Sequence, residues 1–159
     1  MTRFIVTSMW TENIKEMGQL AETNRKDYCS QHGYTWRCCY QSMDTSRHPV
    51  WTKLLWLLQL MDEYEAGCWI QWTDADSLVI NPEIRLEQLI GLVTPEVNFI
   101  ATKDRWTGFN CGQFLIRICE WSKQLLYNAY HKYPDCLSHK CREQESMRRE
   151  LSKYVEEVG

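Results

Sequence analysis

Two aspartates, Asp74 and Asp76, stand one residue apart at the end of an apolar, aromatic-rich run in the stretch CWIQWTDADSLVINP, residues 68–82. Two carboxylates held close together repel each other unless one is protonated or a cation joins them. Mn²⁺ or Mg²⁺ removes this conflict, because such ions prefer oxygen ligands and keep positions open for substrate phosphates. In extended backbone both side chains point to one side, so they can share one ion. The pattern predicts a metal site at Asp74 and Asp76, and the plainer interpretation is an acidic turn.

The elements that must position these aspartates alternate between strands and helices. Short apolar runs predict strands at residues 3–8, 34–40, 68–72, 77–80, 97–102 and 111–118. Apolar residues at helical spacing, with glycine or proline at the ends, predict helices at 11–32, 50–66, 83–91, 120–133 and 142–157. Such alternation favours an α/β fold with a mixed, mostly parallel sheet flanked by helices, in one domain over residues 1–159. In these sheets ligands bind beyond the carboxyl ends of the strands, where the aspartates are expected.

The overall composition excludes several classes of protein. A formal net charge of -3 lacks the basic excess of a nucleic-acid binder, so no nucleic-acid partner is expected. The longest apolar stretch, VWTKLLWLLQLM, is too short to span a bilayer and contains Lys53 and Gln59. The N-terminus shows no signal-peptide pattern. We therefore expect a cytoplasmic protein with no membrane span in this chain.

The eight cysteines contain no C-x-x-C pair, which argues against a zinc ribbon. Cys136, His139 and Cys141 form a loose cluster with His131 nearby, and a zinc site there is a hypothesis. The alternative is that the cysteines act as small buried hydrophobic residues. Together with the absence of an N-glycosylation sequon, this usage favours a reducing interior.

Several segments together resemble one known family. WIQWTDADSLVINPEIRLEQLI resembles the D-x-D region of GT-A glycosyltransferases. RFIVTSMWTENIKEMGQLAETNRKDYCSQHGY is similar to the first strand and the NR..Y...HGY helix end of glycosyltransferase family 34, which comprises fungal α-galactosyl/mannosyltransferases and plant xyloglucan xylosyltransferases. HPVWTKLLWLLQLM, FNCGQFLIRICEWSKQLLYNAY and CREQESMRREL resemble that family's W-x-K helix, its N-x-G-x-F-L-I-R segment and its late [DE]-Q-x-A segment. The segments follow the family's order over essentially the whole chain.

The resemblance implies a GT-A (Rossmann-like) nucleotide-diphospho-sugar transferase fold. It also implies a metal-dependent glycosyltransferase that moves a sugar from a UDP- or GDP-sugar to a glycan or other hydroxyl acceptor, with retention. The cation, Mn²⁺ or Mg²⁺, stabilises the charge that develops on the departing nucleoside diphosphate. Family members are anchored in the Golgi, so a fragment of such an enzyme would belong in the Golgi lumen. They also carry a C-terminal histidine that completes the metal site, and because this sequence shows none at that position we expect a minimal or truncated member.

Roles for the acidic residues follow from the same resemblance. Asp74 would contact the nucleotide ribose and the metal, and Asp76 would coordinate the metal that bridges the donor diphosphate. Glu143 and Gln144 correspond to the family's acidic-Gln pair near the anomeric carbon. The alternative for Glu143 and Gln144 is an ordinary helix start, where acidic residues are favoured.

Five further positions are predicted to bind the donor. Thr7 and Ser8 come just after the first predicted strand, where such folds receive the nucleotide base, although they could simply begin a loop. Lys53 lies in an apolar helix face and either reaches the donor or snorkels to the surface. Asn110 and Gly112 are expected to line the donor-sugar pocket, since glycine permits close approach of backbone to a ligand.

A loop and two histidines complete the candidates. Asp104 and Arg105 are predicted to frame the same pocket, and Trp106 is a candidate platform for the acceptor. His131 or His139 is a candidate replacement for the missing metal histidine.

Two other interpretations stay open. A phosphatase of the haloacid-dehalogenase type also has a strand followed by D-x-D, but its nucleophile follows the first strand, whereas about seventy residues precede Asp74. The second interpretation is a non-catalytic relative that keeps the fold and binds a nucleotide or glycan. Metal-dependent hydrolysis of a nucleotide sugar separates an enzyme from such a relative, and hydrolysis of an aryl phosphate identifies a phosphatase.

Overall fold

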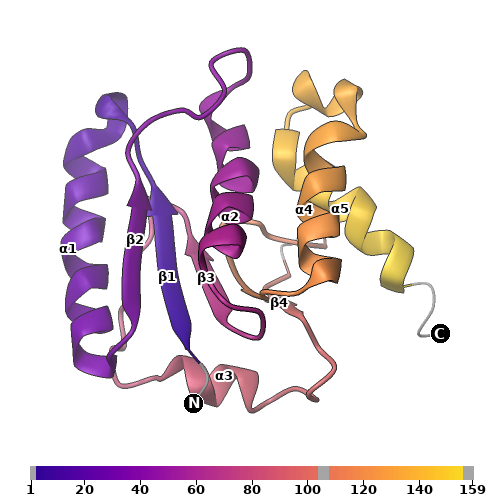
Figure 1. Cartoon of the computed structure of the whole chain (residues 1–159). Coiled ribbons are helices and arrows are strands. Elements are labelled where there is room, and N and C mark those ends of the chain that lie inside the picture. Colours follow the sequence, from indigo (N-terminus) through magenta and orange to yellow (C-terminus); the bar gives the residue numbers. More distant parts are fainter. Residues whose placement is uncertain (1–2, 104–107, 156–159) are drawn as a thin grey trace.

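A five-stranded sheet with helices on both faces forms the part of the chain that the computed structural model describes, residues 3–103 and 108–155 (Figure 1). The strands are β1 (Phe4–Met9), β2 (Thr35–Cys39), β3 (Trp69–Thr73), β4 (Phe99–Ala101) and β5 (Gln113–Arg117). The α-helices are α1 (Lys15–His32), α2 (Thr52–Glu63), α3 (Leu86–Ile90), α4 (Glu120–His131) and α5 (Arg142–Val155). Short 3₁₀ helices are η1 (Glu12–Ile14), η2 (Pro49–Trp51) and η3 (Pro134–Leu137).

The strand order is β2-β1-β3-β5-β4. β1 pairs in parallel with β2 and with β3, placing Ile5 opposite Ile70 and Thr7 opposite Trp72. β5 runs antiparallel to both of its neighbours, β3 and β4. The predicted mixed, mostly parallel α/β sheet is therefore confirmed. This topology brings the end of β3 and the beginning of β5 to the same edge, because antiparallel neighbours start where their partners end.

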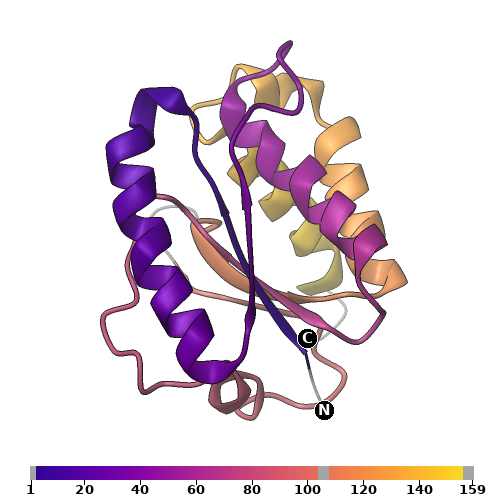
Figure 2. The ribbon, with the colours of Figure 1, turned by 60° about the vertical axis from the view of Figure 1, so that its left-hand side comes forward.

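The two faces of the sheet carry separate apolar clusters. α2, α4 and α5 cover one face, over a core that includes Leu57, Ile70 and Ile116. α1 and α3 cover the other face, where Phe4 and Trp69 pack. Figures 1 and 2 show α1 on the opposite side of the sheet from α2. Within the described ranges, no helix combines the length and apolar character that crossing a bilayer requires.

Residues 77–80, predicted to be a strand, are not one. Leu78 and Ile80 are 50% and 93% exposed. The backbone N–H of Val79 donates to the Asn24 Oδ1 at 2.7 Å, and the Asn24 Nδ2 donates to the Val79 carbonyl at 3.1 Å. The edges of β3 are already occupied by β1 and β5, so this segment finds a side-chain amide on α1 instead of a neighbouring strand.

The buried face of α1 also differs from expectation. Helical spacing placed Ile14, Met17, Leu20, Ala21 and Tyr28 on it. In the structure Met17 and Leu20 are 42% and 67% exposed, while the charged Glu22 and Arg25 are buried. Periodicity counts apolar residues only, whereas a charged side chain can be buried when hydrogen bonds satisfy it on several sides.

The first turn of α5 is held by a carboxylate that binds two arginines. Arg148 donates to both oxygens of Glu145 at 2.7 Å, and the Arg149 Nε donates to one of them at 2.8 Å. The Arg148 hydrogen bonds outweigh the opposing effect of burial, and with Arg149 they lower the pKa of Glu145 to about 2. This pairing fixes the helix end that carries Glu143 and Gln144.

The Glu145 pairing makes stability depend on pH. Because the folded pKa lies below the ordinary 4.5, the carboxylate stabilises the fold above about pH 4.5, and this contribution is lost as pH falls toward about 2. We expect Glu145→Gln to lower the free energy of unfolding by about 2 kcal/mol at pH 7, with a smaller difference at about pH 3. Urea unfolding of both proteins at the two pH values checks this. Glu12→Gln, which breaks an exposed pair with Lys15, serves as the control and should cost under about 1 kcal/mol.

Candidate active site

Two segments meet at the edge of the sheet where β3 ends and β5 begins. The acidic turn containing Asp74 and Asp76 follows β3, and Asn110 and Gly112 immediately precede β5. The Asp74 backbone N–H donates to the Gly112 carbonyl at 2.8 Å, which continues the β3–β5 pairing by one residue. The topology thus brings together four of the residues predicted from the sequence.

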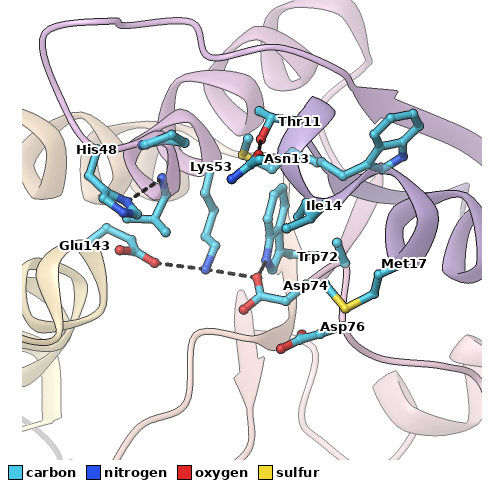
Figure 3. A pocket seen from close by; sticks show the side chains of 15 residues that line it. Thr11, Asn13, Ile14, Met17, His48, Lys53, Trp72, Asp74, Asp76 and Glu143 are labelled. Carbon is cyan, nitrogen blue, oxygen red and sulfur yellow. Dashed lines mark hydrogen bonds and ion pairs between the residues drawn. The ribbon is translucent and has the colours of Figure 1, made fainter.

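The two aspartates line two cavities at once. One cavity, of about 430 Å³, lies between the residues that follow β1, the beginning of α2 and the acidic turn (Figure 3). Trp10, Asn13, His48, Lys53, Trp72 and Glu143 are among its other lining residues. A second cavity, of about 340 Å³, is lined by Asp74 and Asp76 together with Thr102, Asn110, Gly112 and Gln144. Asp74 and Asp76 therefore form the boundary between a largely apolar cavity and a polar one.

One oxygen of Asp74 is fixed by two donors. The Trp72 Nε1 donates to the Asp74 Oδ1 at 2.7 Å, and the Lys53 Nζ forms an ion pair with the same oxygen at 3.2 Å. The other oxygen lies beside Gly112, where an added Cβ would come within 3.2 Å of it and within 2.9 Å of the Asn110 Oδ1. A side chain at position 112 would displace these two oxygens, which glycine leaves in place. The Asp74 Oδ1 is thus bound by Trp72 and Lys53, whereas the Oδ2 lies beside Gly112.

Lys53 lies between two carboxylates. Its ammonium group is buried, donates to the Cys111 carbonyl at 3.0 Å, and pairs with Asp74 and with Glu143, each at 3.2 Å (Figure 3). Burial opposes its charge, but Cys111, Glu143 and Asp74 raise the pKa of Lys53 above its ordinary value, so the lysine stays protonated. The interpretation of Lys53 as a snorkelling surface residue is wrong.

The beginning of α5 brings the acidic-Gln pair to the site. Glu143 is buried, pairs with Lys53 and lines the first cavity. Gln144 lines the second cavity, and its Oε1 accepts a hydrogen bond from the Cys111 N–H at 3.1 Å. Glu143 therefore lies at the first cavity and Gln144 at the second.

Burial also determines the protonation state of the Cys111 side chain. Its pKa is raised to about 12, chiefly by burial, with the positive charge of Lys53 opposing this effect. At neutral pH the side chain is a thiol, which is a weak nucleophile.

Thr7 and Ser8 lie inside β1, because the strand continues to Met9 rather than ending before them. Both are fully buried. The Thr7 hydroxyl donates to the Arg37 carbonyl at 2.9 Å and accepts from the Trp56 Nε1 at 2.8 Å. Neither Thr7 nor Ser8 lines either cavity. The first residues after them that line the first cavity are Met9 and Trp10.

The two candidate replacement histidines lie elsewhere. The His131 ring packs against Tyr127, with ring centroids 4.3 Å apart, and the His139 Nδ1 accepts from the Cys141 N–H at 3.1 Å. Neither histidine lines either cavity. Across residues 3–103 and 108–155, no group of three or more His, Cys, Asp or Glu side chains is arranged to hold a metal, so Cys136, His139 and Cys141 do not form such a group in this structure.

The donor set present fits a cation that is shared with a substrate. Magnesium-type ions are commonly bound by one or two carboxylates and complete their shell with substrate phosphates and water. Asp76 is exposed, and both Asp74 and Asp76 line the two cavities, so two carboxylates are available at their boundary. The candidates Asp104, Arg105 and Trp106 lie outside the described residues.

Three lining or supporting residues were missed in the sequence. Trp10 contributes to the first cavity and is held by its Nε1, which donates to the Glu22 Oε2 at 3.0 Å. His48 lines the same cavity and caps the beginning of η2, where its Nδ1 accepts from the Val50 N–H at 3.4 Å. Arg25 lies buried behind the acidic turn. The HPVW and NR..Y...HGY segments contained the signals for His48 and Arg25.

Comparison with known sequences places this arrangement among glycosyltransferases. Residues 5–97, more than half of the chain, match the model of the galactosyl transferase GMA12/MNN10 family. Probable glycosyltransferase 2 of Oryza sativa subsp. indica is 32% identical over 108 residues, covering 65% of this chain and 22% of that protein. Xyloglucan 6-xylosyltransferase 4 of Arabidopsis thaliana is 31% identical over 111 residues, covering 67% of this chain and 22% of that protein. The chain spans about a quarter of the length of the curated relatives that it matches.

Comparison with solved structures supports the same fold. A glycosyltransferase involved in the glycosylation of the major capsid of PBCV-1 aligns with a TM-score of 0.75 and 16% identity, covering 96% of this chain and 75% of that one. The glycosyltransferase GlyE of Streptococcus pneumoniae aligns with a TM-score of 0.64 and 15% identity, covering 94% of this chain and 43% of that one. The predicted GT-A class of fold is confirmed. By its sequence match, the chain belongs to the galactosyl transferase GMA12/MNN10 family.

Proposed function

We propose that this chain forms the donor-binding unit of a metal-dependent glycosyltransferase, which moves a sugar from a UDP- or GDP-sugar to a hydroxyl of a glycan or other acceptor with retention. The observation that carries the proposal is the position of Asp74 and Asp76, which line both cavities. A cation, Mn²⁺ or Mg²⁺, held by these carboxylates lies between the contents of the two cavities. Membership of a galactosyl transferase family supports the reaction class.

The chemistry of the two cavities suggests how a donor is divided between them. The first is lined by aromatic and apolar residues such as Trp10, Ile14 and Met17, which suits a nucleobase and ribose. The second is lined by side chains that hydrogen-bond, including Asn110 and Gln144, which suits the hydroxyl groups of a sugar. A diphosphate that joins the two parts then crosses the acidic turn.

The protein's own groups are arranged to hold charge in place at that crossing. When bound, the metal ion supplies Lewis-acid stabilisation of the diphosphate leaving group. Lys53 holds Asp74 through one oxygen and neutralises part of the negative charge around it. Gln144 is fixed through Cys111 at the wall of the proposed sugar cavity. Glu143 is paired with Lys53, and Cys111 is a protonated thiol, so neither is an activated nucleophile beside a base.

Thermal unfolding with and without ligands tests the proposal. We expect the unfolding temperature to rise with UDP or GDP plus Mn²⁺, and to change little with Mn²⁺ alone or with uridine or guanosine plus Mn²⁺. A ligand at a hundred times its Kd adds about 2.7 kcal/mol, a shift of several degrees for a protein of this size. Release of nucleoside diphosphate from the corresponding sugar donor then measures turnover.

Each outcome of this experiment separates one interpretation from the others. A metal-dependent shift with turnover supports the glycosyltransferase. A shift without turnover, with acceptor present or absent, identifies a nucleotide-binding protein that does not catalyse transfer. No shift with either nucleotide contradicts the proposed donor site.

A further inference from the structure

Side chains from α1 and the turn after it bind the segment that carries the two aspartates. Residues of the NR..Y...HGY motif bind partners that are spread over the segment from Ser77 to Glu87. The Tyr28 hydroxyl donates to the Ile84 carbonyl at 2.8 Å, and the His32 Nε2 lies 2.6 Å from the Pro82 carbonyl oxygen. The motif therefore connects α1 to the chain that leaves the active-site edge of the sheet.

Arg25 makes the most concentrated set of these contacts. Its Nη2 donates to the Ser77 carbonyl at 2.7 Å, to the Ser77 Oγ at 2.9 Å and to the Thr73 Oγ1 at 3.1 Å, and it also donates to the Asp74 carbonyl. Its Nη1 is 3.4 Å from the Ser8 Oγ. The side chain is only 1% exposed. One guanidinium thus binds both ends of the turn that contains Asp76.

The hydrogen bonds of the turn itself depend on the same atoms. The Ser77 N–H and its hydroxyl both donate to the Asp74 carbonyl, at 3.2 Å and 2.8 Å. That carbonyl faces Arg25, while the Asp74 carboxylate faces Lys53 and the cavities. Holding the carbonyl toward Arg25 therefore keeps the carboxylate directed to the site.

A buried arginine at this position is costly, so its contacts must compensate for the loss of water. Burial lowers the pKa of Arg25, while surrounding negative charges, those of Asp74 and Asp76 among them, oppose this effect. A guanidinium has five donors in a rigid plane, whereas lysine has three donors on one flexible end. The contacts to Ser77, Thr73 and Asp74 all come from Nη2, and the Nζ of a lysine stands one bond nearer to Cα, so Arg25→Lys draws the donor away from these three partners.

We propose that Arg25 is a positioning residue, which fixes the Asp74–Ser77 turn in the geometry that binds the metal and the donor diphosphate. Asn24, the residue beside it, extends the same support by pairing with both backbone groups of Val79. The link to donor binding rests on the proposed function, whereas the support of the turn by Arg25 can be tested without any ligand.

The experiment compares Arg25→Lys, Ser77→Ala and the control Arg117→Lys. Arg117 is matched to Arg25, because its guanidinium also binds a side chain and a carbonyl, those of Asn98 and Pro95 at 2.7 Å each, but it lines neither cavity. Ser77→Ala removes the hydroxyl contacts from a residue that is not fully buried, so it preserves the fold if Arg25→Lys does not.

Two measurements are made on each folded variant. The first is amide hydrogen exchange of the ligand-free protein at residues 75–79, where we expect at least about tenfold faster exchange in Arg25→Lys and Ser77→Ala, with β1 and α4 unchanged. The second is the affinity for Mn²⁺ with UDP or GDP by calorimetry, together with the electron paramagnetic resonance spectrum of bound Mn²⁺. We expect the affinity to fall at least about tenfold in both variants and to stay unchanged in Arg117→Lys.

The two measurements distinguish a failure of the positioning role of Arg25 from a failure of the proposed function. Faster exchange in the turn of a protein whose wild type binds neither nucleotide supports the positioning of the turn and contradicts the proposed function. Unchanged exchange at residues 75–79 overturns the inference. Faster exchange with wild-type affinity for the Mn²⁺–nucleotide complex also overturns it, because the turn would then be dispensable for binding.

Discussion

Replacing Asp76 with asparagine is expected to weaken Mn²⁺-dependent binding of the nucleoside diphosphate strongly while leaving the fold intact. Asp76 is exposed on a turn at the boundary of the two cavities, so the substitution removes a carboxylate without opening a gap in the core. We expect at least about a hundredfold weaker binding, and transfer slower by about a thousandfold, which corresponds to about 4 kcal/mol in the barrier. Calorimetry with Mn²⁺ and nucleotide, and release of nucleoside diphosphate from the sugar donor, measure the two effects.

The control for Asp76 is Asp27→Asn, which removes a charge from an exposed position on α1. Both variants should keep the unfolding free energy within about 0.5 kcal/mol of wild type, as for surface substitutions in general. Wild-type affinity for the Mn²⁺–nucleotide complex in Asp76→Asn would remove Asp76 from the metal site.

Lys53→Met is expected to be strongly destabilising. The substitution keeps a long side chain but leaves the Asp74 Oδ1 and the buried Glu143 Oε1 without their shared cation. Breaking a buried ion pair from one side costs about 3–5 kcal/mol, because the remaining charge stays out of water. Urea unfolding measures this loss. Where the variant is folded, we also expect weaker nucleotide binding, since Asp74 loses the group that orients it.

A matched pair on the surface supplies the control. Lys123→Met breaks an exposed pair with Asp62 and should cost no more than about 1 kcal/mol. Adding Glu143→Gln to Lys53→Met removes the uncompensated charge, so the double variant should recover part of the lost stability. A cost for Lys53→Met as small as that for Lys123→Met would mean that Lys53 does not stabilise the two carboxylates.

The order of elements was predictable because each depends on local signals. Apolar runs that end at polar residues indicated β1, β2, β3 and β5, and Gly33 marked the end of α1, where it adopts the left-handed backbone conformation that glycine favours. The exception at residues 77–80 is informative. SLVI has the residue types of a strand, but a strand requires a partner, and both edges of β3 were already occupied.

The acidic turn was predictable for a similar reason. Asp74 and Asp76 at the end of an apolar run need no tertiary information to suggest a cation, because their mutual repulsion follows from sequence spacing alone. Asn110, Gly112 and Gln144 were found only through the family resemblance. Their residue types are compatible with many local roles.

The surroundings of the aspartates were decided by contacts between distant segments. Thr7 and Ser8 have the hydroxyl groups of a binding site, yet pairing with β2 and β3 extended β1 past both of them and buried them. The sequence pattern around Lys53 fits the surface and the donor site equally well, and only the ion pairs with Asp74 and Glu143, from two other segments, place it inside the protein. The burial of Arg25 could not be predicted from apolar periodicity, because it depends on carbonyl groups more than forty residues away in the chain.

The sequence by itself determined the alternation of strands and helices, the acidic turn and the family, because these depend on residue types at short spacing and on the order of motifs. The tertiary structure decided which charges are buried and which atoms of the aspartates remain available. Those outcomes depend on three contacts of Asp74: with Gly112 just before the antiparallel strand β5, with Lys53 on α2, and with Arg25 on α1. Such contacts join residues far apart in the chain, so they cannot be predicted from local sequence patterns.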